Sequence, residues 1–127
     1  MTQRSSSQYE TSSMTKSHSR EIVSEEEVEK ALNYLRDSAH ELGQLTTDAR
    51  FAESWVKVVK AMAMKAVEGP VNAQEREAMA SEEVKLAFKE EARTAGELAK
   101  AKALREAAAM KCEIWRTQQA TWRAMKI

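Results

Sequence analysis

Apolar residues recur along the first half of the chain at alternating spacings of four and three, the period of a helix that buries one face. The stripe contains Val28, Leu32, Leu35, Ala39, Leu42, Leu45, Ala49, Ala52, Val56, Val59, Ala63 and Ala66. Only the step from Leu42 to Leu45 breaks the alternation, which overwinds a coiled coil locally without ending the helix. The pattern predicts one helix over residues 24–68, and Ser24 with Glu27 has the order of a capping box at its start.

A short segment, "EGPVNAQE", follows this helix. Gly69 suits the C-terminal cap of a helix, and Pro70 cannot continue the hydrogen-bond ladder. Asn72 with Glu75 resembles a second capping box, so we expect a short helix over residues 73–80.

A second long helix is predicted over residues 82–126, because Ser81 and two glutamates are typical of a helix start and no proline follows. Its apolar positions include Val84, Phe88, Ala92, Ala95, Leu98, Leu104, Ala107, Met110, Ile114 and Met125. Two long helices with a short connection favour an antiparallel, coiled-coil-like hairpin. Such a hairpin buries one stripe per helix, so we expect an all-α domain over residues 24–127 that forms a homo-oligomer, with a marginal monomer as the alternative.

Residues 1–23 have a different composition, rich in Ser, Thr and Gln. Too few apolar side chains are present to offset the entropy lost on ordering, so a disordered tail is predicted. It is either a solvated terminus or a flexible arm that contacts a partner.

The overall composition fits a helical protein of a reducing compartment. Three glycines and one proline argue against strands, and 20 basic residues cancel 20 acidic ones. A single cysteine, Cys112, excludes an intrachain disulfide framework. Neither an apolar run long enough for a membrane span nor a secretory signal is found, so we expect a cytoplasmic protein without membrane contact.

Patterns typical of a catalytic, metal or cofactor site are missing from the sequence. The glycines at 43, 69 and 96 are too scattered for a phosphate loop. His18, His40 and Cys112 lie too far apart along the chain to suggest metal ligands. Carboxylates alternate with lysines as they do on solvated helix faces. We therefore expect a non-enzymatic protein without a cofactor.

The strongest candidate for binding is the stretch "IWRTQQATWR" near the C-terminus. Trp115 and Trp122 lie one heptad apart, and Arg116 and Arg123 follow them directly. Tryptophan and arginine can stack on unpaired bases while arginine contacts phosphate. A lesser cluster of the same type is formed by Lys57, Lys60 and Lys65 with Trp55.

Helix electrostatics and helix packing could also account for these residues without any ligand. Basic side chains near the end of a helix complement its dipole, and an antiparallel hairpin would place them beside the acidic residues that begin the first helix. Tryptophans at heptad spacing commonly pack against another helix.

The segments "EVEKALNYLRDSAHELGQLTTDARFAESWVKVVKAMAMKA", "REAMASEEVKLAFKEE" and "ALREAAAMKCEIWRTQQATWRA" resemble small helical proteins from the DNA-metabolism and recombination regions of tailed bacteriophages. The resemblance covers about residues 26–124 and includes a C-terminal stretch of Trp115, Arg116, Thr117, Gln118, Ala120 and Thr121. Ala and Val replace the aromatic residues expected in the first half. The order of parts is also similar to that of the recombination mediators of T-even phages.

The resemblance implies an accessory protein of phage DNA recombination or replication, which binds single-stranded DNA or a recombinase. The alternative from the residues alone is a coiled-coil adaptor, assembly factor or inhibitor whose Trp-Arg end contacts another protein, because Trp and Arg dominate such contacts.

Overall fold

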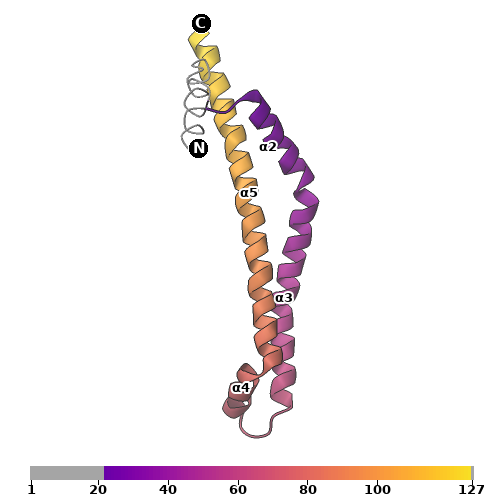
Figure 1. Ribbon diagram of the computed structural model, residues 1–127. Helices are drawn as coiled ribbons and strands as arrows, with labels where there is room; N and C mark the ends of the chain where they lie inside the picture. The colour runs from indigo at the N-terminus through magenta and orange to yellow at the C-terminus, as the bar shows by residue number, and fades with distance from the viewer. Residues whose placement is uncertain (1–21, 127) are drawn as a thin grey trace, which may run out of the picture. The chain divides into compact units, whose positions relative to one another are not determined.

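The computed structural model describes residues 22–126, which form four helices and no strand. In chain order these are α2 (Glu25–Asp37), α3 (Ala39–Lys65), α4 (Val71–Ala80) and α5 (Glu82–Lys126) (Figure 1). The all-α fold class predicted from the sequence is confirmed.

The chain divides into two compact units, and α5 contributes to both. The first, called here the α2 unit, combines the described residues up to Asp37 with those from Arg105 onward. The second, called the α3–α4 unit, consists of Ser38–Leu104 and therefore includes the first part of α5.

Within the α3–α4 unit, α3 and the first part of α5 run side by side in opposite directions (Figure 1). Ala49 of α3 and Leu98 of α5 line one shallow hollow, whereas Val59 and Leu86 line another. Residue numbers therefore rise along one helix as they fall along the other. Val84, which has no exposed surface, anchors the start of α5 in this packing.

Residues 24–68, expected to form one helix, are divided into two. The division falls at Ser38, which has φ −89° and ψ −1°. The backbone therefore departs from regular helical geometry at this one position between α2 and α3. In an uninterrupted helix the Leu35 carbonyl would accept the N–H of residue 39. Here that carbonyl also accepts a hydrogen bond from Arg105 Nη1 at 2.8 Å. A side chain of α5 thus donates a hydrogen bond to a backbone carbonyl in the last turn of α2.

The buried face of α2 and α3 differs from the predicted stripe at two positions. Ala31 is 5% exposed and Ser38 is 8% exposed, whereas Leu32 is 55% exposed. The buried and half-buried positions include Val28, Ala31, Leu35, Ser38, Leu42, Leu45, Ala49, Ala52, Val56, Val59 and Ala63. The spacing of these positions alternates between three and four, without the predicted stammer. The stammer came from choosing Leu32 and Ala39 for the stripe in place of their neighbours Ala31 and Ser38.

The buried face of α5 includes polar residues that a search for apolar periodicity does not identify. Its buried and half-buried positions include Val84, Ala87, Glu91, Thr94, Leu98, Ala101, Arg105, Ala108, Cys112 and Trp115. Phe88, Leu104, Met110 and Met125 were expected on this face and are exposed. Thr94 tolerates burial because its hydroxyl donates to the Glu90 and Glu91 carbonyls of its own helix, both at 3.0 Å.

In the α2 unit, Gln118 of α5 holds the chain where it enters α2. Its side-chain oxygen accepts from the Ile22 and Val23 N–H groups at 2.8 and 3.2 Å, and its Nε2 donates to the Val23 carbonyl at 2.8 Å. Val23 is 4% exposed. Residues 22 and 23, which the sequence assigns to the tail, are thus bonded to α5, and the rest of the predicted tail, residues 1–21, lies outside the described part of the chain.

Two of the three predicted helix starts agree with the structure, and one does not. Ser24 and Glu27 form the predicted capping box, and Ser81 Oγ accepts the Val84 N–H at 3.3 Å. The capping box predicted at Asn72 is wrong. Helix α4 starts two residues earlier than expected, because Pro70 acts as its N-cap with φ −68° and ψ 160°.

The connection between α3 and α4 begins before its glycine. The Ala66 N–H bonds to the Ala63 carbonyl at 3.3 Å, which ends α3 with a tightened turn at Lys65. Gly69 follows with φ 116°, a left-handed conformation that other residues rarely adopt. Gln74 Nε2 donates to the Val67 carbonyl at 2.8 Å and closes the loop over the first turn of α4.

Candidate functional site

The two tryptophans of the predicted binding stretch belong to the packed side of the α2 unit. Trp115 and Trp122 are both half-buried. Trp122 lines a surface hollow of about 450 Å³ with Ile22, Ile114 and Gln118. Their indole faces are thus partly occupied by the packing of this unit, which reduces the area open to a stacked base.

The neighbouring arginines point to a different side and are solvent-exposed. Arg116 donates to Glu113 Oε2 on its own helix at 2.7 Å, and both side chains are more than 60% exposed. Arg123 forms no ion pair with another residue of the described range. The acidic residues at the start of α2, which were expected to pair with these arginines, therefore do not do so.

The lysines of the second cluster lie on α3 but not as one set. Lys57 and Lys65 are exposed, whereas Lys60 is half-buried and donates to Glu75 Oε2 of α4 at 2.8 Å. This ion pair lowers the pKa of Glu75, through the hydrogen bond and then the charge of Lys60. All three lysines belong to the α3–α4 unit, whereas the Trp-Arg stretch belongs to the α2 unit.

A further surface of α3 was not singled out from the sequence. Phe51, Trp55, Val58 and Met62 are spaced by four, three and four residues, and their exposed fractions are 64, 44, 44 and 62%. The rings of Phe51 and Trp55 stack, with centroids 5.9 Å apart and planes inclined by 14°. Helix α3 therefore has a second apolar stripe beside the one that packs on α5.

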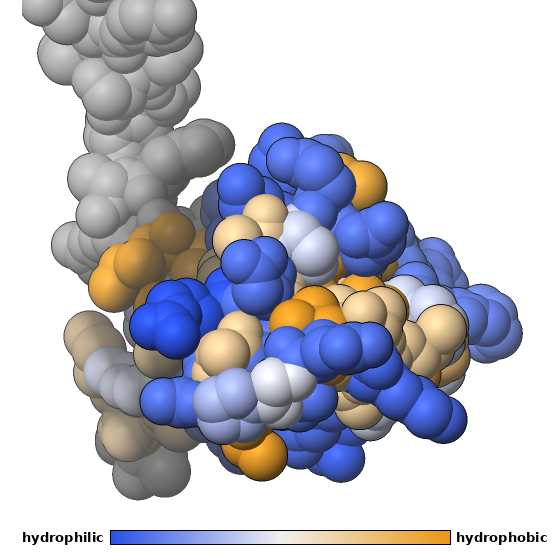
Figure 2. Space-filling model, turned by 90° about the horizontal axis from the view of Figure 1, so that it is seen from below, coloured by the Kyte–Doolittle hydropathy of each residue, from blue (hydrophilic) through white to orange (hydrophobic). Residues whose placement is uncertain are grey.

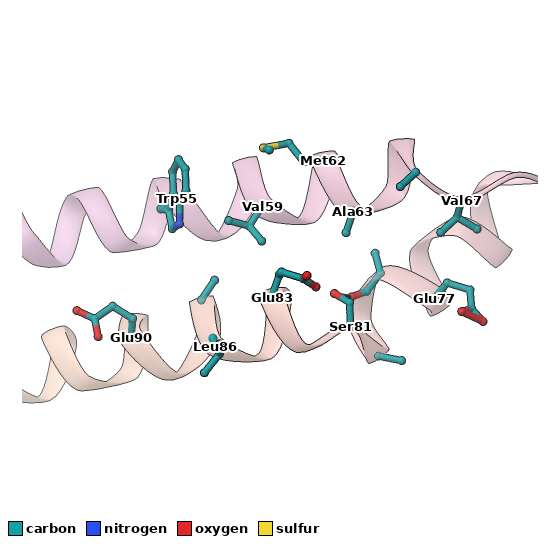
Figure 3. Close-up of a pocket in the computed structure, with 14 residues that line it drawn as sticks. Trp55, Val59, Met62, Ala63, Val67, Glu77, Ser81, Glu83, Leu86 and Glu90 are labelled. Atoms are coloured by element: carbon teal, nitrogen blue, oxygen red, sulfur yellow. Dashed lines mark hydrogen bonds between the residues drawn. The ribbon is translucent and has the colours of Figure 1, made fainter.

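Two residues of this stripe, Trp55 and Met62, line an open groove of about 910 Å³ between α3, the end of α4 and the start of α5 (Figure 3). From α3 and its end come Trp55, Val59, Met62, Ala63, Ala66 and Val67. From α4 and α5 come Glu77, Ala78, Ala80, Ser81, Glu83, Leu86, Ala87 and Glu90. We call this surface the α3–α5 groove.

Alanines explain why the groove is hollow. Ala63 of α3 and Ala66, its C-cap residue, line the groove together with Ala78 and Ala87, and such short side chains cannot fill the space between helices. The larger side chains of the lining are partly wet, since Met62 is 62% and Leu86 60% exposed. In Figure 3, Val59 and Ala63 point from α3 toward the helix that carries Glu83.

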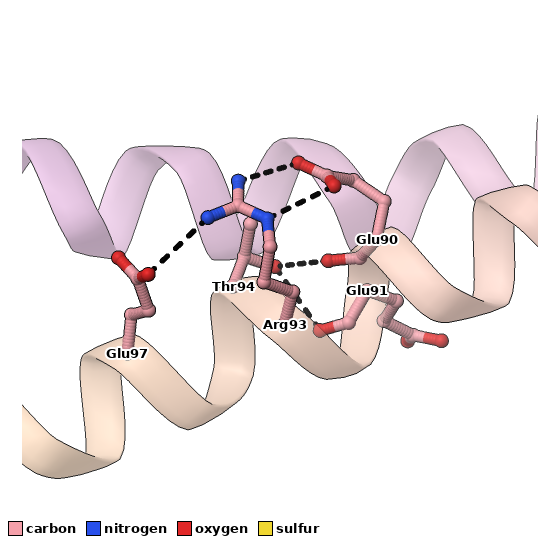
Figure 4. Close-up of polar contacts among 5 residues, drawn as sticks. All are labelled: Glu90, Glu91, Arg93, Thr94 and Glu97. Carbon is pink, nitrogen blue, oxygen red and sulfur yellow. Dashed lines mark hydrogen bonds and ion pairs between the residues drawn. The ribbon is translucent and has the colours of Figure 1, made fainter.

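The charged residues that line the groove are all acidic: Glu77, Glu83 and Glu90. Glu90 is the one that pairs within the described range, because Arg93 donates to its two carboxylate oxygens at 3.0 and 2.6 Å and to Glu97 at 3.3 Å (Figure 4). These hydrogen bonds lower the pKa of Glu90 and raise that of Arg93. Glu77 and Glu83 have no such cation among the described residues.

Apolar exposure continues onto α4, where Val71 is 68% and Met79 is 42% exposed. Seen from the end of the molecule at the α3–α4 connection, hydrophobic residues form separate small areas among hydrophilic ones (Figure 2).

Residues 22–126 hold no group of three or more His, Cys, Asp or Glu side chains arranged for a metal ion. Cys112 is reduced and half-buried, and His40 is exposed on α3. None of the described helices is both long and apolar enough to cross a membrane.

No protein-family model matches the chain, and no match was found among the curated proteins or the solved structures. The resemblance to phage proteins therefore stays a prediction from the sequence. Function is inferred from the side chains and surfaces of the chain itself.

Proposed function

We propose that this chain is a non-enzymatic helical protein-interaction module, an adaptor or assembly factor that receives a partner protein in the α3–α5 groove. The supporting observation is the groove itself, an apolar hollow edged by Trp55, Met62 and Leu86, which are 44, 62 and 60% exposed. Aromatic and methionine side chains are enriched at protein interfaces, and contiguous exposed apolar surface is uncommon on a monomer.

The energetic argument favours occupation of the groove. Burying the exposed part of each large apolar side chain contributes on the order of 1 kcal/mol, from about 25 cal/mol per Å² of apolar surface. Several such side chains meet in one groove, so a partner could gain a few kcal/mol there before its charged contacts are counted. The three glutamates that line this open groove fit protein binding better than catalysis, because a catalytic site encloses its substrate among convergent polar groups.

The proposal is tested by placing a photo-crosslinking amino acid at Met62 of the full chain, in the cells that produce it. We expect a discrete protein adduct that disappears when Leu86→Gln is added, because that change removes apolar surface from the opposite side of the groove. The matched control has the crosslinker at Leu104, which is 50% exposed and lies outside the groove. Equal adducts from both positions would contradict the proposal.

A second function, binding of single-stranded DNA by a phage-type recombination accessory protein, is supported by one observation. Arg116 and Arg123 are solvent-exposed and are not neutralised by the acidic start of α2. Such a surface could contact phosphates even though Trp115 and Trp122 are half-buried. This second function includes the oligomer and the recombinase partner that the resemblance implies.

Titration with a fluorescent oligothymidine at low and moderate salt tests the second function. If the protein binds single-stranded DNA, we expect micromolar affinity for the oligonucleotide that falls steeply with salt, because each phosphate contact releases a counterion. Arg116→Gln with Arg123→Gln should weaken binding about tenfold or more, whereas Lys57→Gln with Lys65→Gln reports the separate lysine cluster. If the oligonucleotide does not bind even at low salt, DNA binding is wrong and the protein-interaction function is unaffected.

A further inference from the structure

We propose that the occupant of the α3–α5 groove is a basic amphipathic helix of another protein, about three turns long. This inference rests on the proposed protein-interaction function and adds the chemistry of the partner. It follows from three properties of the groove: the sign of its charge, the small residues of its floor, and its length.

The first property is charge. Carboxylates are the only ionisable groups that line the groove, and Glu77 and Glu83 have no ion pair within the described range. Lys60 of α3 does not line the groove and is bonded to Glu75. Lysines or arginines that flank the apolar face of a partner could therefore pair with Glu77 and Glu83, and complementary charge selects partners as well as speeding association.

The same charge argues against a second copy of this chain as the occupant. A two-fold contact would bring the groove of one copy onto that of another, so the acidic rims would repel each other. A contact between the groove and the basic C-terminal end of another copy would be head-to-tail and would propagate into open chains. A different protein avoids both consequences.

The second property is the alanine-lined floor. Ala63, Ala66, Ala78 and Ala87 leave space for larger side chains to enter from outside. Leucine, methionine or phenylalanine at positions i, i+3 or i+4 and i+7 of a helix would fill that space as knobs fill holes. Trp55 and Met62 stand at the edge, and Met62 has an unbranched side chain that can adapt to such a surface.

The third property is length. The groove follows α3 from Trp55 to Ala66, a run of eleven steps along the chain. At 1.5 Å per residue this is roughly 16 Å, or three helical turns. A partner helix of about 12 residues is therefore long enough to cover the groove.

The test uses full-length protein and three fluorescein-labelled synthetic peptides, followed by fluorescence anisotropy. The first peptide is an 18-residue amphipathic helix with leucines at i, i+3, i+4 and i+7 and lysines elsewhere. The second replaces every lysine by glutamate, and the third has the composition of the first in a scrambled, non-amphipathic order. We expect micromolar binding of the first peptide and at least tenfold weaker binding of the other two.

Protein variants localise the binding. Met62→Gln and Leu86→Gln should each weaken the first peptide about fivefold or more, whereas Leu104→Gln, an equal change outside the groove, should not. Glu77→Gln with Glu83→Gln should weaken it and flatten its salt dependence, and Glu106→Gln is the matched control. All of these side chains are exposed, and circular dichroism checks that each variant remains helical.

Two results would overturn the inference. Equal binding of the lysine and glutamate peptides would show that charge does not select the occupant. Concentration-dependent self-association in sedimentation that Leu86→Gln abolishes would identify a second copy instead. If the crosslinked protein adduct at Met62 persists while no basic peptide binds, the partner class is wrong and the proposed function stands. If both experiments are negative, both fail.

Discussion

At the scale of single residues, hydrogen bonds to backbone groups decide where the helices begin. At the start of α2, the Glu27 N–H donates to Ser24 Oγ at 3.1 Å, and the Ser24 N–H donates to Glu27 Oε1 at 2.9 Å. The two bonds satisfy donors that a helix otherwise leaves to water. This arrangement was readable from the sequence because it depends on residues three positions apart.

Ser24→Ala should lower the free energy of unfolding by about 1 kcal/mol, because the first turn of α2 loses its cap. Ser54→Ala, an exposed change within α3, is the control and should cost nothing or stabilise by a few tenths of a kcal/mol, since alanine favours helix. Urea unfolding followed by circular dichroism measures both. Equal effects of the two substitutions would contradict the capping role.

The capping bond also gives a pH dependence. The Ser24 N–H bond to the Glu27 carboxylate, more than any other cause, lowers the pKa of Glu27 below its ordinary value of 4.5. A depressed folded-state pKa stabilises the fold above the unfolded pKa, and this contribution is lost as pH falls through the folded pKa. Urea unfolding should therefore show Glu27→Gln to be less stable than the parent at pH 7 and equal to it once the pH falls below the folded-state pKa, and Glu26→Gln, an exposed change without the capping bond, is the control.

At the scale of elements, the sequence predicted where helices form better than it predicted which of their faces are buried. Residues 82–126 were expected to be helical and form α5, because no proline interrupts them. The buried faces were harder to predict, because hydrophobicity favoured Leu32 over Ala31, and because Arg105 and Gln118 join the packed face through bonds to the chain around α2. Partners distant in sequence cannot be read from local pattern.

The groove escaped prediction for a similar reason. Trp55 and Met62 have the spacing of a heptad, which the sequence displays, but which apolar stripe faces another helix depends on packing across the unit. In the Trp-Arg stretch, Arg116 and Arg123 are exposed, whereas Trp122 lines a hollow together with Ile22 of the chain before α2, a neighbour that the local pattern does not reveal.

Gln118→Ala should loosen α2 in particular. Three hydrogen bonds join this buried side chain to the backbone of Ile22 and Val23, and removing it leaves buried groups unpaired at a cost of about 1–3 kcal/mol. Hydrogen–deuterium exchange should show faster exchange in α2 while α4 is unchanged. Gln119→Ala, the neighbouring half-buried glutamine, is the control. Uniformly faster exchange throughout the chain would show that the effect is not local.

At the scale of the whole molecule, charge balance and exposed apolar surface act together. The 20 basic residues cancel the 20 acidic ones, and the isoelectric point is about 6.8. A protein near zero net charge lacks the repulsion that keeps apolar surfaces apart. Copies of the protein can then associate non-specifically through the exposed apolar side chains of the groove.

Solubility should therefore pass through a minimum near pH 6.8. Met62→Gln with Leu86→Gln should raise solubility at that minimum without moving it, because apolar surface is removed and net charge is unchanged. Polyethylene glycol precipitation across pH 5–9 measures this. Asn33→Gln with Ser54→Gln, which exchanges exposed polar residues, is the control, and an equal rise in solubility there would contradict the role of the groove.

The bonds from Gln118 to Val23 and from Arg105 to Leu35 lie at opposite ends of α2. Alanine-rich helices with a seven-residue repeat can slide past each other by one repeat and still match small side chains with small ones. A slip of α2 along its partner would break both bonds at once and separate two polar side chains from the carbonyls that they bind. These two side chains thus hold a repetitive interface in a single alignment.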